Sequence, residues 1–455
     1  MRGTYGADFD VRTVYRVGRA LPRVFGRLGG GVSAPRILVG RDCRVTSAAV
    51  RDALVAGLLE AGAEVTDLGL CTTPMVYFFT AADGYDGSAM ITASHNPPSD
   101  NGIKVSMRTA LPVGYASGLD EVERLVLADA AEYVGGTPPP VASVPDAAER
   151  YVEWQKSHGG ALQPDALRFA VDCSCGMASL LVPALYPSAT VLNGVMDGRF
   201  PAHSPNPLKE EARAQVAAAV REGGLDCGVV FDGDADRAMF VDETGRFVQP
   251  DMLIPAVAEE SLRLAGGPGA AGERPRVLHD VRTSRGVSET LAEGGFEPVM
   301  VPVGHAFAKP KMREHRALCG GELAGHYYFG DFFGCDSGVL AASRILAAVA
   351  AAKQRGVTFS GMMKAVSSRY ANSGEMNFRV EDKDAAIERV VAAAEKFGRQ
   401  TGMSEMDGVR IEFEDGWVNV RKSNTEPYLR LIAENRSPDG LARWIGALEV
   451  AIGAR

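Results

Sequence analysis

Short apolar runs alternate with amphipathic stretches along most of this chain. Residues 36–42, 65–70 and 87–91 have the length and composition of buried strands, whereas apolar residues recur at helical spacing over 14–25 and 47–61. Strands that alternate with helices are typical of crossover units and predict a mostly parallel sheet. The opening residues 3–10 are rich in Gly and Asp, so we expect a turn there.

The pattern then restarts twice, because residues 168–172 and 276–280 repeat the short apolar run between an Arg and an Asp seen at 36–42. Each unit also has a late apolar run that stops at a polar loop. These runs are 89–91 before Ser94, 227–231 before Asp232 and 317–319 before Gly320. We infer three related α/β domains, each presenting a functional loop from the carboxyl end of a strand, where open α/β sheets bind ligands.

The last part of the chain differs, since a strand, a helix, a hairpin, a strand and a closing helix are predicted between 375 and 452. This order indicates a smaller α+β domain. Stretches rich in Gly, Pro or Ser at 135–140, 266–275 and 367–373 are the predicted linkers. The expected domains are I (1–145), II (146–250), III (251–368) and IV (369–455).

Length, net charge and Cys content exclude several classes of function. A chain of 455 residues is too long for one core. A net charge of −9 argues against nucleic acid or an anionic membrane as a partner. The N-terminus has no apolar leader, no uncharged run reaches membrane length, and the seven Cys are scattered. We therefore expect a cytoplasmic protein with free thiols, no membrane partner and no nucleic-acid partner.

The first candidate site is the run 92–97, Thr-Ala-Ser-His-Asn-Pro, where an apolar strand stops and a Pro- and Asn-rich turn follows. We interpret Ser94 as a nucleophile that carries a phosphoryl group. The adjacent His95 would suggest a hydrolase-like Ser–His pair. Neighbouring side chains of an extended stretch point in opposite directions, so we expect His95 not to be the partner of Ser94.

The second candidate site is Asp232-Gly-Asp-Ala-Asp236, directly after a buried strand. Three carboxylates in a tight turn repel one another unless a hard cation such as Mg²⁺ neutralises them. An EF-hand would need Gly where Arg237 stands, and a haloacid-dehalogenase-type phosphatase would need Thr or Val at Asp236. A solvated acidic loop is the remaining alternative.

Two further motifs carry weaker signals. In isolation, residues 320–326 resemble any Gly-rich loop with an incidental Glu and His, and residues 421–430 resemble an ordinary charged hairpin turn. As parts of a site, the first suits sugar hydroxyls and the second suits a phosphate dianion. Together with Ser94 and the Asp triplet they indicate phosphoryl transfer on a phosphorylated polyol.

These four motifs, T-A-S-H-N-P, D-G-D-A-D-R, G-E-x-x-G-H and R-x-S-N-T-E-P, resemble the α-D-phosphohexomutase family over nearly the whole chain and in the same order. The resemblance implies four domains around a central cleft, three of them α/β and the last related to the TATA-binding-protein fold. It also implies an isomerase that moves a phosphoryl group between O1 and O6 of a hexose phosphate. The reaction would pass through phospho-Ser94 and a bisphosphorylated sugar.

The resemblance assigns a role to each motif. It places Mg²⁺ on Asp232, Asp234, Asp236 and an oxygen of phospho-Ser94. The other implied catalytic residues are His95, Lys104, Arg237, His305 and His326. The implied sugar-binding residues are Arg282, Glu322, Leu323, Ala324, Gly325 and His326. The implied phosphate-binding residues are Arg421, Ser423, Asn424, Thr425 and Arg430. A hexose 1,6-bisphosphate would act as activator, and the enzyme would be a monomer or a weak homodimer.

Two departures from the family pattern bear on activity and on sugar preference. Asp8 stands where many members carry an Arg that reaches the active site, so that contact is lost or supplied from elsewhere, with Arg12 as a candidate. Ala324 replaces a common Ser, which removes a hydrogen bond worth about 0.5–1.5 kcal/mol. Leu323 stands where the glucosamine enzymes carry Gln. We expect a phosphomannomutase first and a phosphoglucomutase second. The alternatives are a phosphoglucosamine mutase, a sugar phosphatase and a weakly active sugar-phosphate-binding relative.

Overall fold

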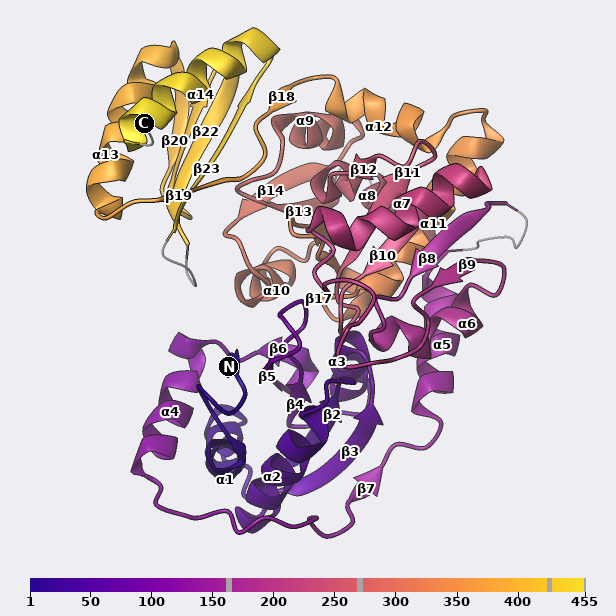
Figure 1. The fold of residues 1–455 in the computed structure, drawn as a ribbon, viewed down its shortest axis with the longest axis vertical. Helices are drawn as coiled ribbons and strands as arrows, with labels where there is room; N and C mark the ends of the chain where they lie inside the picture. The colour runs from indigo at the N-terminus through magenta and orange to yellow at the C-terminus, as the bar shows by residue number, and fades with distance from the viewer. Residues whose placement is uncertain (161–165, 268–272, 424–427, 454–455) are drawn as a thin grey trace.

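The computed structural model describes residues 1–160, 166–267, 273–423 and 428–453, and these residues form four β-sheets (Figure 1). Each sheet lies within one of the expected domains. We therefore propose domain boundaries after residues 145, 250 and 368. The stretch around 266–275 is not such a boundary, because the helix before it, α8 (Ile254–Leu264), packs against α11 (Gly338–Gln354) of domain III.

The sheet of domain I has the strand order β1-β5-β4-β2-β3-β7, with β6 paired to β5. Strands β3, β2 and β4 are parallel, and β5 runs antiparallel beside β4. The strands are β1 (Arg2–Thr4), β2 (Arg36–Arg41), β3 (Glu64–Leu70), β4 (Gly87–Ile91), β5 (Asp100–Met107), β6 (Leu111–Pro112) and β7 (Ala142–Ser143). The helices are α1 (Val11–Leu28), α2 (Ser47–Glu60), α3 (Thr73–Ala82) and α4 (Leu119–Ala128).

Domains II and III repeat this arrangement of three parallel strands and an antiparallel neighbour. In domain II the sheet consists of β8 (Phe169–Asp172), β9 (Thr190–Leu192), β10 (Cys227–Phe231), β11 (Ala238–Asp242) and β12 (Phe247–Val248), with α5 (Ala147–His158), α6 (Val182–Leu185) and α7 (Glu210–Gly223). In domain III it consists of β13 (Arg276–Asp280), β14 (Glu297–Val301), β15 (Cys319–Gly321), β16 (Tyr327–Phe329) and β17 (Cys335–Asp336), with α9 (Arg285–Glu293), α10 (His305–Glu314) and α12 (Phe359–Ser367).

The candidate loops occupy equivalent places in the three sheets. Each joins the third parallel strand to its antiparallel neighbour, between β4 and β5, between β10 and β11, and between β15 and β16. The prediction of three related units with loops at the carboxyl ends of strands is therefore confirmed.

Two local predictions were wrong. Residues 2–4 form strand β1 rather than part of a turn, because Arg2, Gly3 and Thr4 pair with residues 100–102 of β5. The third strand of domain III is Cys319–Gly321, so its loop starts two residues later than expected. Gly320 and Gly321 belong to the strand because both pair with β13 and β16. Glycine is needed there because a Cβ at either position would come within 3 Å of Leu278 or Ile254.

Domain IV is an antiparallel sheet covered by two helices, as predicted. Its strands are β18 (Ala371–Asn372), β19 (Met376–Arg379), β20 (Gln400–Ser404), β21 (Val409–Phe413), β22 (Gly416–Lys422) and β23 (Tyr428–Asn435), with α13 (Lys383–Ala394) and α14 (Pro438–Ile452). In Figure 1 it lies beside domain III and away from domain I. The Arg285 amide of domain III donates to a Glu434 carboxylate oxygen at 2.8 Å, which ties the two domains together.

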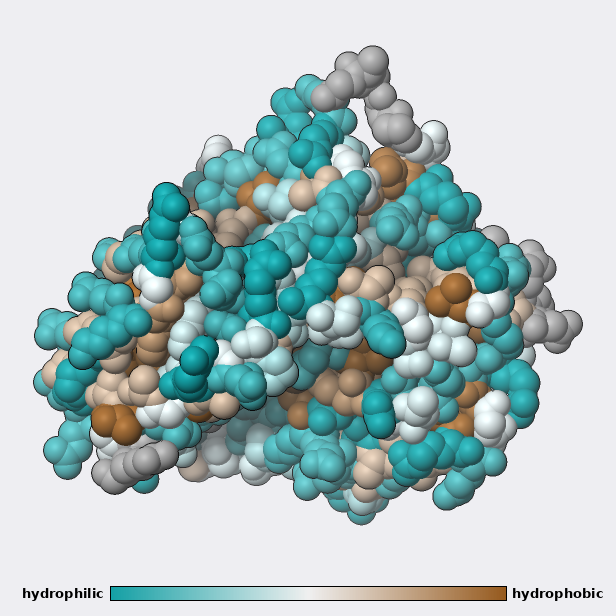
Figure 2. Space-filling model, turned by 90° about the horizontal axis from the view of Figure 1, so that it is seen from above, coloured by the Kyte–Doolittle hydropathy of each residue, from teal (hydrophilic) through white to brown (hydrophobic). Residues whose placement is uncertain are grey.

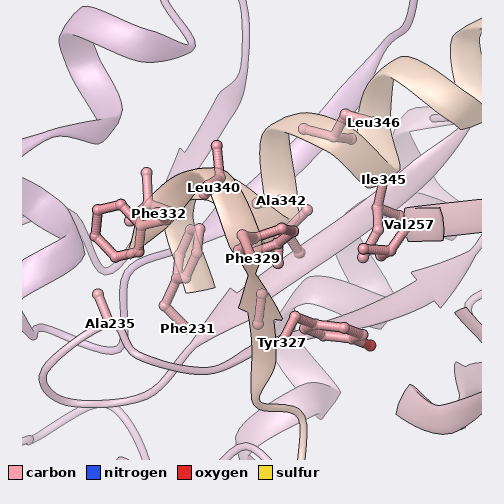
Figure 3. Close-up of a cluster of buried hydrophobic side chains, with 14 of the residues drawn as sticks. Phe231, Ala235, Val257, Tyr327, Phe329, Phe332, Leu340, Ala342, Ile345 and Leu346 are labelled. Atoms are coloured by element: carbon pink, nitrogen blue, oxygen red, sulfur yellow. The ribbon is translucent and has the colours of Figure 1, made fainter. Parts of the chain in front are cut away.

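The largest apolar core crosses domain boundaries. It joins side chains of α3 in domain I to strands and helices of domains II and III. In Figure 3, Phe231 of domain II lies among Phe329, Phe332 and Leu340 of domain III. The face in Figure 2 is mostly hydrophilic, with apolar residues in small groups. Among the helices of the described residues, none has the length and apolarity needed to cross a bilayer.

Candidate active site

Ser94 lies in a tight turn three residues after β4 ends. Its φ of 54° is left-handed, and its amide donates to Thr92 Oγ1 at 2.8 Å. The buried Ser94 hydroxyl donates to Asp232 Oδ2 of domain II at 2.8 Å. The prediction that His95 points away was wrong, since His95 Nδ1 lies 3.3 Å from Ser94 Oγ. The stretch is a turn rather than extended, so the alternation of side chains does not apply.

Arg44, which sequence reasoning missed, holds this turn in place. Its buried guanidinium donates to the carbonyl oxygens of Ser94 at 2.7 Å, Asn96 at 2.8 Å and Pro97 at 2.6 Å. The guanidinium also pairs with Asp42 at 3.1 Å. A second Arg shortly after the Arg-Asp end of β2 is the only sequence signal, and by itself it does not indicate which loop the side chain supports.

We expect Arg44→Met to destabilise domain I by about 3–5 kcal/mol, because it breaks a buried ion pair and leaves several carbonyls without donors. Thermal unfolding and limited proteolysis at residues 92–100 measure the effect. Arg41→Met, at the half-buried end of β2, is the matched control and should stay within about 0.5 kcal/mol. Equal proteolysis rates in both variants would show that Arg44 does not hold the loop.

The three carboxylates of domain II converge as predicted. Oxygens of Asp232, Asp234 and Asp236 lie within 4.8 Å of one another, and all three residues are buried. Lys104 of β5 places its ammonium 2.6 Å from Asp234 Oδ2 and 2.5 Å from Asp236 Oδ2. Asp234 Oδ1 and Asp236 Oδ1 are buried without a hydrogen-bond partner among the described residues. Unsatisfied buried carboxylate oxygens fit a hard divalent cation.

The pKa values of the three triad carboxylates shift in different directions. Burial, followed by the charges of Asp236 and Asp234, raises the pKa of Asp232 well above its ordinary value. Burial also opposes ionisation of Asp234 and Asp236, but Lys104 acts against it together with Thr73 at Asp234 and with His326 and Arg237 at Asp236, so the pKa of each is lowered. The pKa of Lys104 is raised, since these carboxylates overcome the effect of burial. Lys104 is therefore the resident counter-ion of the triad.

Thr73, at the start of α3, was also missed. Its hydroxyl donates to Asp234 Oδ2 at 2.5 Å, and its amide donates to the Asp234 carbonyl at 3.0 Å. Together with Lys104 and Ser94, Thr73 makes domain I a direct support of the domain II loop.

Arg237 connects the triad to domain III. Its Nε donates to His326 Nε2 at 2.9 Å, and its amide donates to Asp232 Oδ1 at 3.2 Å. His326 Nδ1 lies 2.8 Å from Asp336 Oδ2, and the buried Asp336 is paired with Lys309 at 2.7 Å. A proton on Nδ1 and an accepting Nε2 satisfy both contacts, so this network selects one tautomer of His326.

His305 lies at the start of α10, with its ring centroid 6.1 Å from that of His326. Burial, followed by the Lys309 charge, lowers the pKa of His305 well below its ordinary value. The structure thus brings His305, His326, Arg237 and the triad together, as the sequence predicted.

The predicted sugar-binding residues surround a buried carboxylate. Tyr328 Oη donates to Glu322 Oε1 at 2.5 Å, and burial raises the pKa of Glu322. Arg282 pairs with Asp280 at 2.7 Å and lies 3.9 Å from Glu322. In the loop itself, the Leu323 amide donates to Asp280 at 3.1 Å. Ala324 is partly buried, and Gly325 has a left-handed φ of 83°.

The predicted phosphate-binding residues of domain IV meet a carboxylate of their own domain. Arg421 donates to Glu375 Oε1 at 2.7 Å, and Arg430 lies 3.3 Å from Glu375 Oε2. Arg282 of domain III is 3.6 Å from the same carboxylate. Ser423 is buried, whereas Asn424 and Thr425 lie outside the described residues. Sequence reasoning missed Glu375 as a partner of these arginines, although it is the first residue of a predicted strand.

Comparison with known proteins agrees with this geometry. Four phosphoglucomutase/phosphomannomutase domain families match the chain in order. They are alpha/beta/alpha domain I at residues 1–131, domain II at 149–245, domain III at 249–370 and the C-terminal domain at 375–449. A protein named "Phosphohexose mutases" from Xanthomonas campestris is 37% identical over 89% of this chain and 88% of its own length.

The chain belongs to the phosphoglucomutase/phosphomannomutase family. It is therefore a phosphohexomutase, an isomerase of carbohydrate metabolism. A phosphomannomutase from Vibrio cholerae is 32% identical over 96% of this chain and 93% of its own. The crystal structure of a family protein from Burkholderia thailandensis superposes with a TM-score of 0.84, at 29% identity, over 100% of this chain and 96% of that one. The magnesium dependence of this family fits the carboxylate triad.

Proposed function

We propose that this phosphohexomutase interconverts the 1-phosphate and 6-phosphate of a hexose, with mannose first and glucose second. The observation that carries the mechanism is the buried Ser94 hydroxyl, 2.8 Å from Asp232 of the carboxylate triad. A hydroxyl next to a cation-binding triad is suited to carrying a phosphoryl group.

Phospho-Ser94 would donate its phosphoryl group to a sugar hydroxyl. The bond between phosphorus and Ser94 Oγ breaks as phosphorus bonds to the sugar oxygen, a base takes the hydroxyl proton, and Ser94 Oγ takes up a proton. The bisphosphorylated sugar then turns over and returns its other phosphate to Ser94. A hexose 1,6-bisphosphate would load Ser94 and so act as activator.

Different residues would bind the metal, contact the phosphoryl group and transfer protons. Asp232, Asp234, Asp236 and a phosphoserine oxygen would hold Mg²⁺, which stabilises negative charge on the transferring phosphoryl oxygens. Arg237 would contact the same group, and Lys104, His95, His305 and His326 are the candidates for proton transfer. His326 accepts from Arg237 through Nε2, so a sugar hydroxyl would compete with Arg237 for that nitrogen.

Glu322 and His326 would bind the sugar hydroxyls, with Arg282 nearby. Arg421, Ser423, Asn424, Thr425 and Arg430 would bind the phosphate that does not react. Glu375 supports this assignment, because a carboxylate between Arg421 and Arg430 occupies the kind of position that a phosphate oxygen would take.

A panel of hexose 1-phosphates tests the substrate. With Mg²⁺ and a hexose 1,6-bisphosphate present, we expect kcat/KM to be highest for mannose 1-phosphate, with glucose 1-phosphate close behind and glucosamine 1-phosphate at least tenfold lower. The readout is formation of the 6-phosphate. A higher kcat/KM for glucosamine 1-phosphate would overturn the sugar assignment.

The same reactions separate a mutase from a phosphatase. A mutase releases no inorganic phosphate as substrate is consumed, whereas a phosphatase releases one phosphate for each sugar. Phosphate released at the rate of substrate loss would therefore contradict the proposal.

A further inference from the structure

A large open cavity lies outside the active site, where domains I, II and III meet. Its volume is about 870 Å³, within the range of about 300–1,000 Å³ that small-molecule sites occupy. Its walls come from the segment after β5, the C-terminal ends of α5, α8 and α10, and the segment between β16 and β17. None of the described residues that line it belongs to the proposed active site, so a ligand there would not compete directly with a hexose phosphate.

The cavity is cationic, although the protein has a net charge of −9. Its charged lining residues are three arginines and one aspartate. The buried Arg344 pairs with Asp331 and donates to the His158 carbonyl at 3.1 Å, so these two charges offset each other. Arg313 and Arg316 therefore leave an excess of positive charge at the cavity.

The two remaining arginines are held in different ways. The Arg313 guanidinium donates to the Lys309 carbonyl at 3.2 Å and to the Thr109 carbonyl at 2.7 Å, which fixes it at the wall. Arg316 is exposed, and its guanidinium makes no hydrogen bond or ion pair among the described residues. A guanidinium binds phosphate oxygens through parallel N–H groups, so an anion in the cavity would find one fixed donor group and one free one.

Left-handed backbone presents three side chains to the cavity. Thr109 has a φ of 60°, Arg316 of 48° and Phe333 of 56°. A positive φ is uncommon for residues with a Cβ, and Arg316 follows α10 at the place where helices commonly end on Gly. Residues kept in such conformations cluster at ligand-binding sites. A hydroxyl, a cation and an aromatic ring are thus brought to one cavity by backbone that favours other residues.

Much of the remaining wall is apolar. Leu264, Met312 and Leu318 line the cavity together with the half-buried ring of Phe333. A flat ligand ring would gain both apolar burial and ring–ring contact there. Two guanidiniums and an apolar wall with an accessible aromatic ring suit a ligand that has an anionic group at one end and a ring at the other.

We infer that this cavity is a regulatory site for an organic phosphate that carries an aromatic ring, the chemistry of a nucleoside monophosphate. Arg313 and Arg316 bind the phosphate oxygens, and the ring packs against Phe333. Inorganic phosphate uses only the cations and an uncharged nucleoside uses only the apolar wall, so each should bind more weakly than the nucleotide. Binding at this site does not depend on the proposed function.

Two walls of the cavity lead to the active site. Strand β5 carries Lys104 and runs on toward Thr109. Helix α10 begins at His305 and carries Arg313 near its end. The hydrogen bond from Arg313 to the Thr109 carbonyl joins the two elements, and a phosphate on Arg313 competes with that carbonyl. Occupancy should therefore change how His305 is held relative to Lys104 and lower the mutase rate, an effect that rests on the proposed function.

Calorimetric titration of the full-length protein with adenosine 5′-monophosphate tests the binding site. We expect the wild type to bind it, and to bind adenosine and inorganic phosphate at least about tenfold more weakly. Arg316→Leu should weaken nucleotide binding by a similar factor. Lys311→Leu is the matched control, because it removes a cation of α10 that pairs with Glu314 and does not line the cavity, and it should bind as the wild type does. Equal affinity of Arg316→Leu and the wild type, or no binding to the wild type, would overturn the inference.

Arg316→Gly separates binding from folding. Glycine adopts the left-handed backbone without strain, so this variant should melt at the wild-type temperature or higher and still lose nucleotide affinity. Its kcat/KM without nucleotide should match the wild type. Adenosine 5′-monophosphate should lower the kcat/KM of the wild type by about fivefold or more and leave that of Arg316→Gly unchanged. Binding without any change in the wild-type kcat/KM would refute the regulatory role. A wild-type protein that binds the nucleotide but has no mutase activity would refute the proposed function and leave the binding site established.

Discussion

Ser94→Ala is expected to lose mutase activity by at least a factor of about 10⁴, because the chain then has no atom to carry the phosphoryl group between sugars. Intact mass should show a phosphate on the wild-type protein after incubation with a hexose 1,6-bisphosphate and none on the variant. The fold should survive, since the contacts that hold the turn use the Ser94 backbone and not its hydroxyl.

Ser99→Ala is the matched control. Ser99 is exposed in the same loop, and its hydroxyl contacts only Asp100, at 3.4 Å, among the described residues. It should keep wild-type activity and phosphorylation. Phosphate retained on Ser94→Ala at the wild-type level would place the phosphoryl carrier elsewhere and refute the mechanism.

Asp232→Asn is expected to lower Mg²⁺-dependent kcat by about 10³-fold or more, because it removes a carboxylate from the triad and the acceptor nearest to the Ser94 hydroxyl. The decisive readout is a magnesium titration of activity and of melting temperature. The wild-type protein should be stabilised by added Mg²⁺. The variant should show little of this shift.

Thermal unfolding without magnesium provides a second test of the role of Asp232. The pKa of Asp232 is raised by burial and by its two neighbours, so the folded state opposes its ionisation. For a carboxyl group whose folded pKa is raised, stability falls as pH rises from the unfolded pKa toward the folded one. The Asp232→Asn variant carries a neutral amide at this position. In EDTA at neutral pH it should therefore unfold at the same temperature as the wild type or higher.

Asp226→Asn is the control for charge removal, because Asp226 directly precedes β10 but pairs with Lys353 away from the triad. It should leave the Mg²⁺ response unchanged. A full magnesium response in Asp232→Asn would show that the triad does not hold the ion.

The loops were predictable because their signals are local. A buried strand that stops at Ser94 or at Asp232 shows directly in the order of apolar and polar residues, and parallel strands present such ends at one edge of a sheet. The repeated pattern also predicted three units of one kind. The incorrect predictions also concern short segments of the chain. Ser94 adopts a left-handed backbone, which brings His95 to its hydroxyl, and β1 is too short for a pattern of alternation.

The sequence by itself determined the strand and helix order, the four motifs and the carboxylate triad, because each depends on residues close together in the chain. Only the tertiary structure decided which groups from other strands and other domains complete the site. Lys104 and Thr73 reach across from domain I to Asp234, and within domain I Arg44 holds the Ser94 turn from a different strand end. These contacts depend on how sheets and domains pack together, and hydrophobic periodicity carries no information about which distant charged side chains that packing brings into contact.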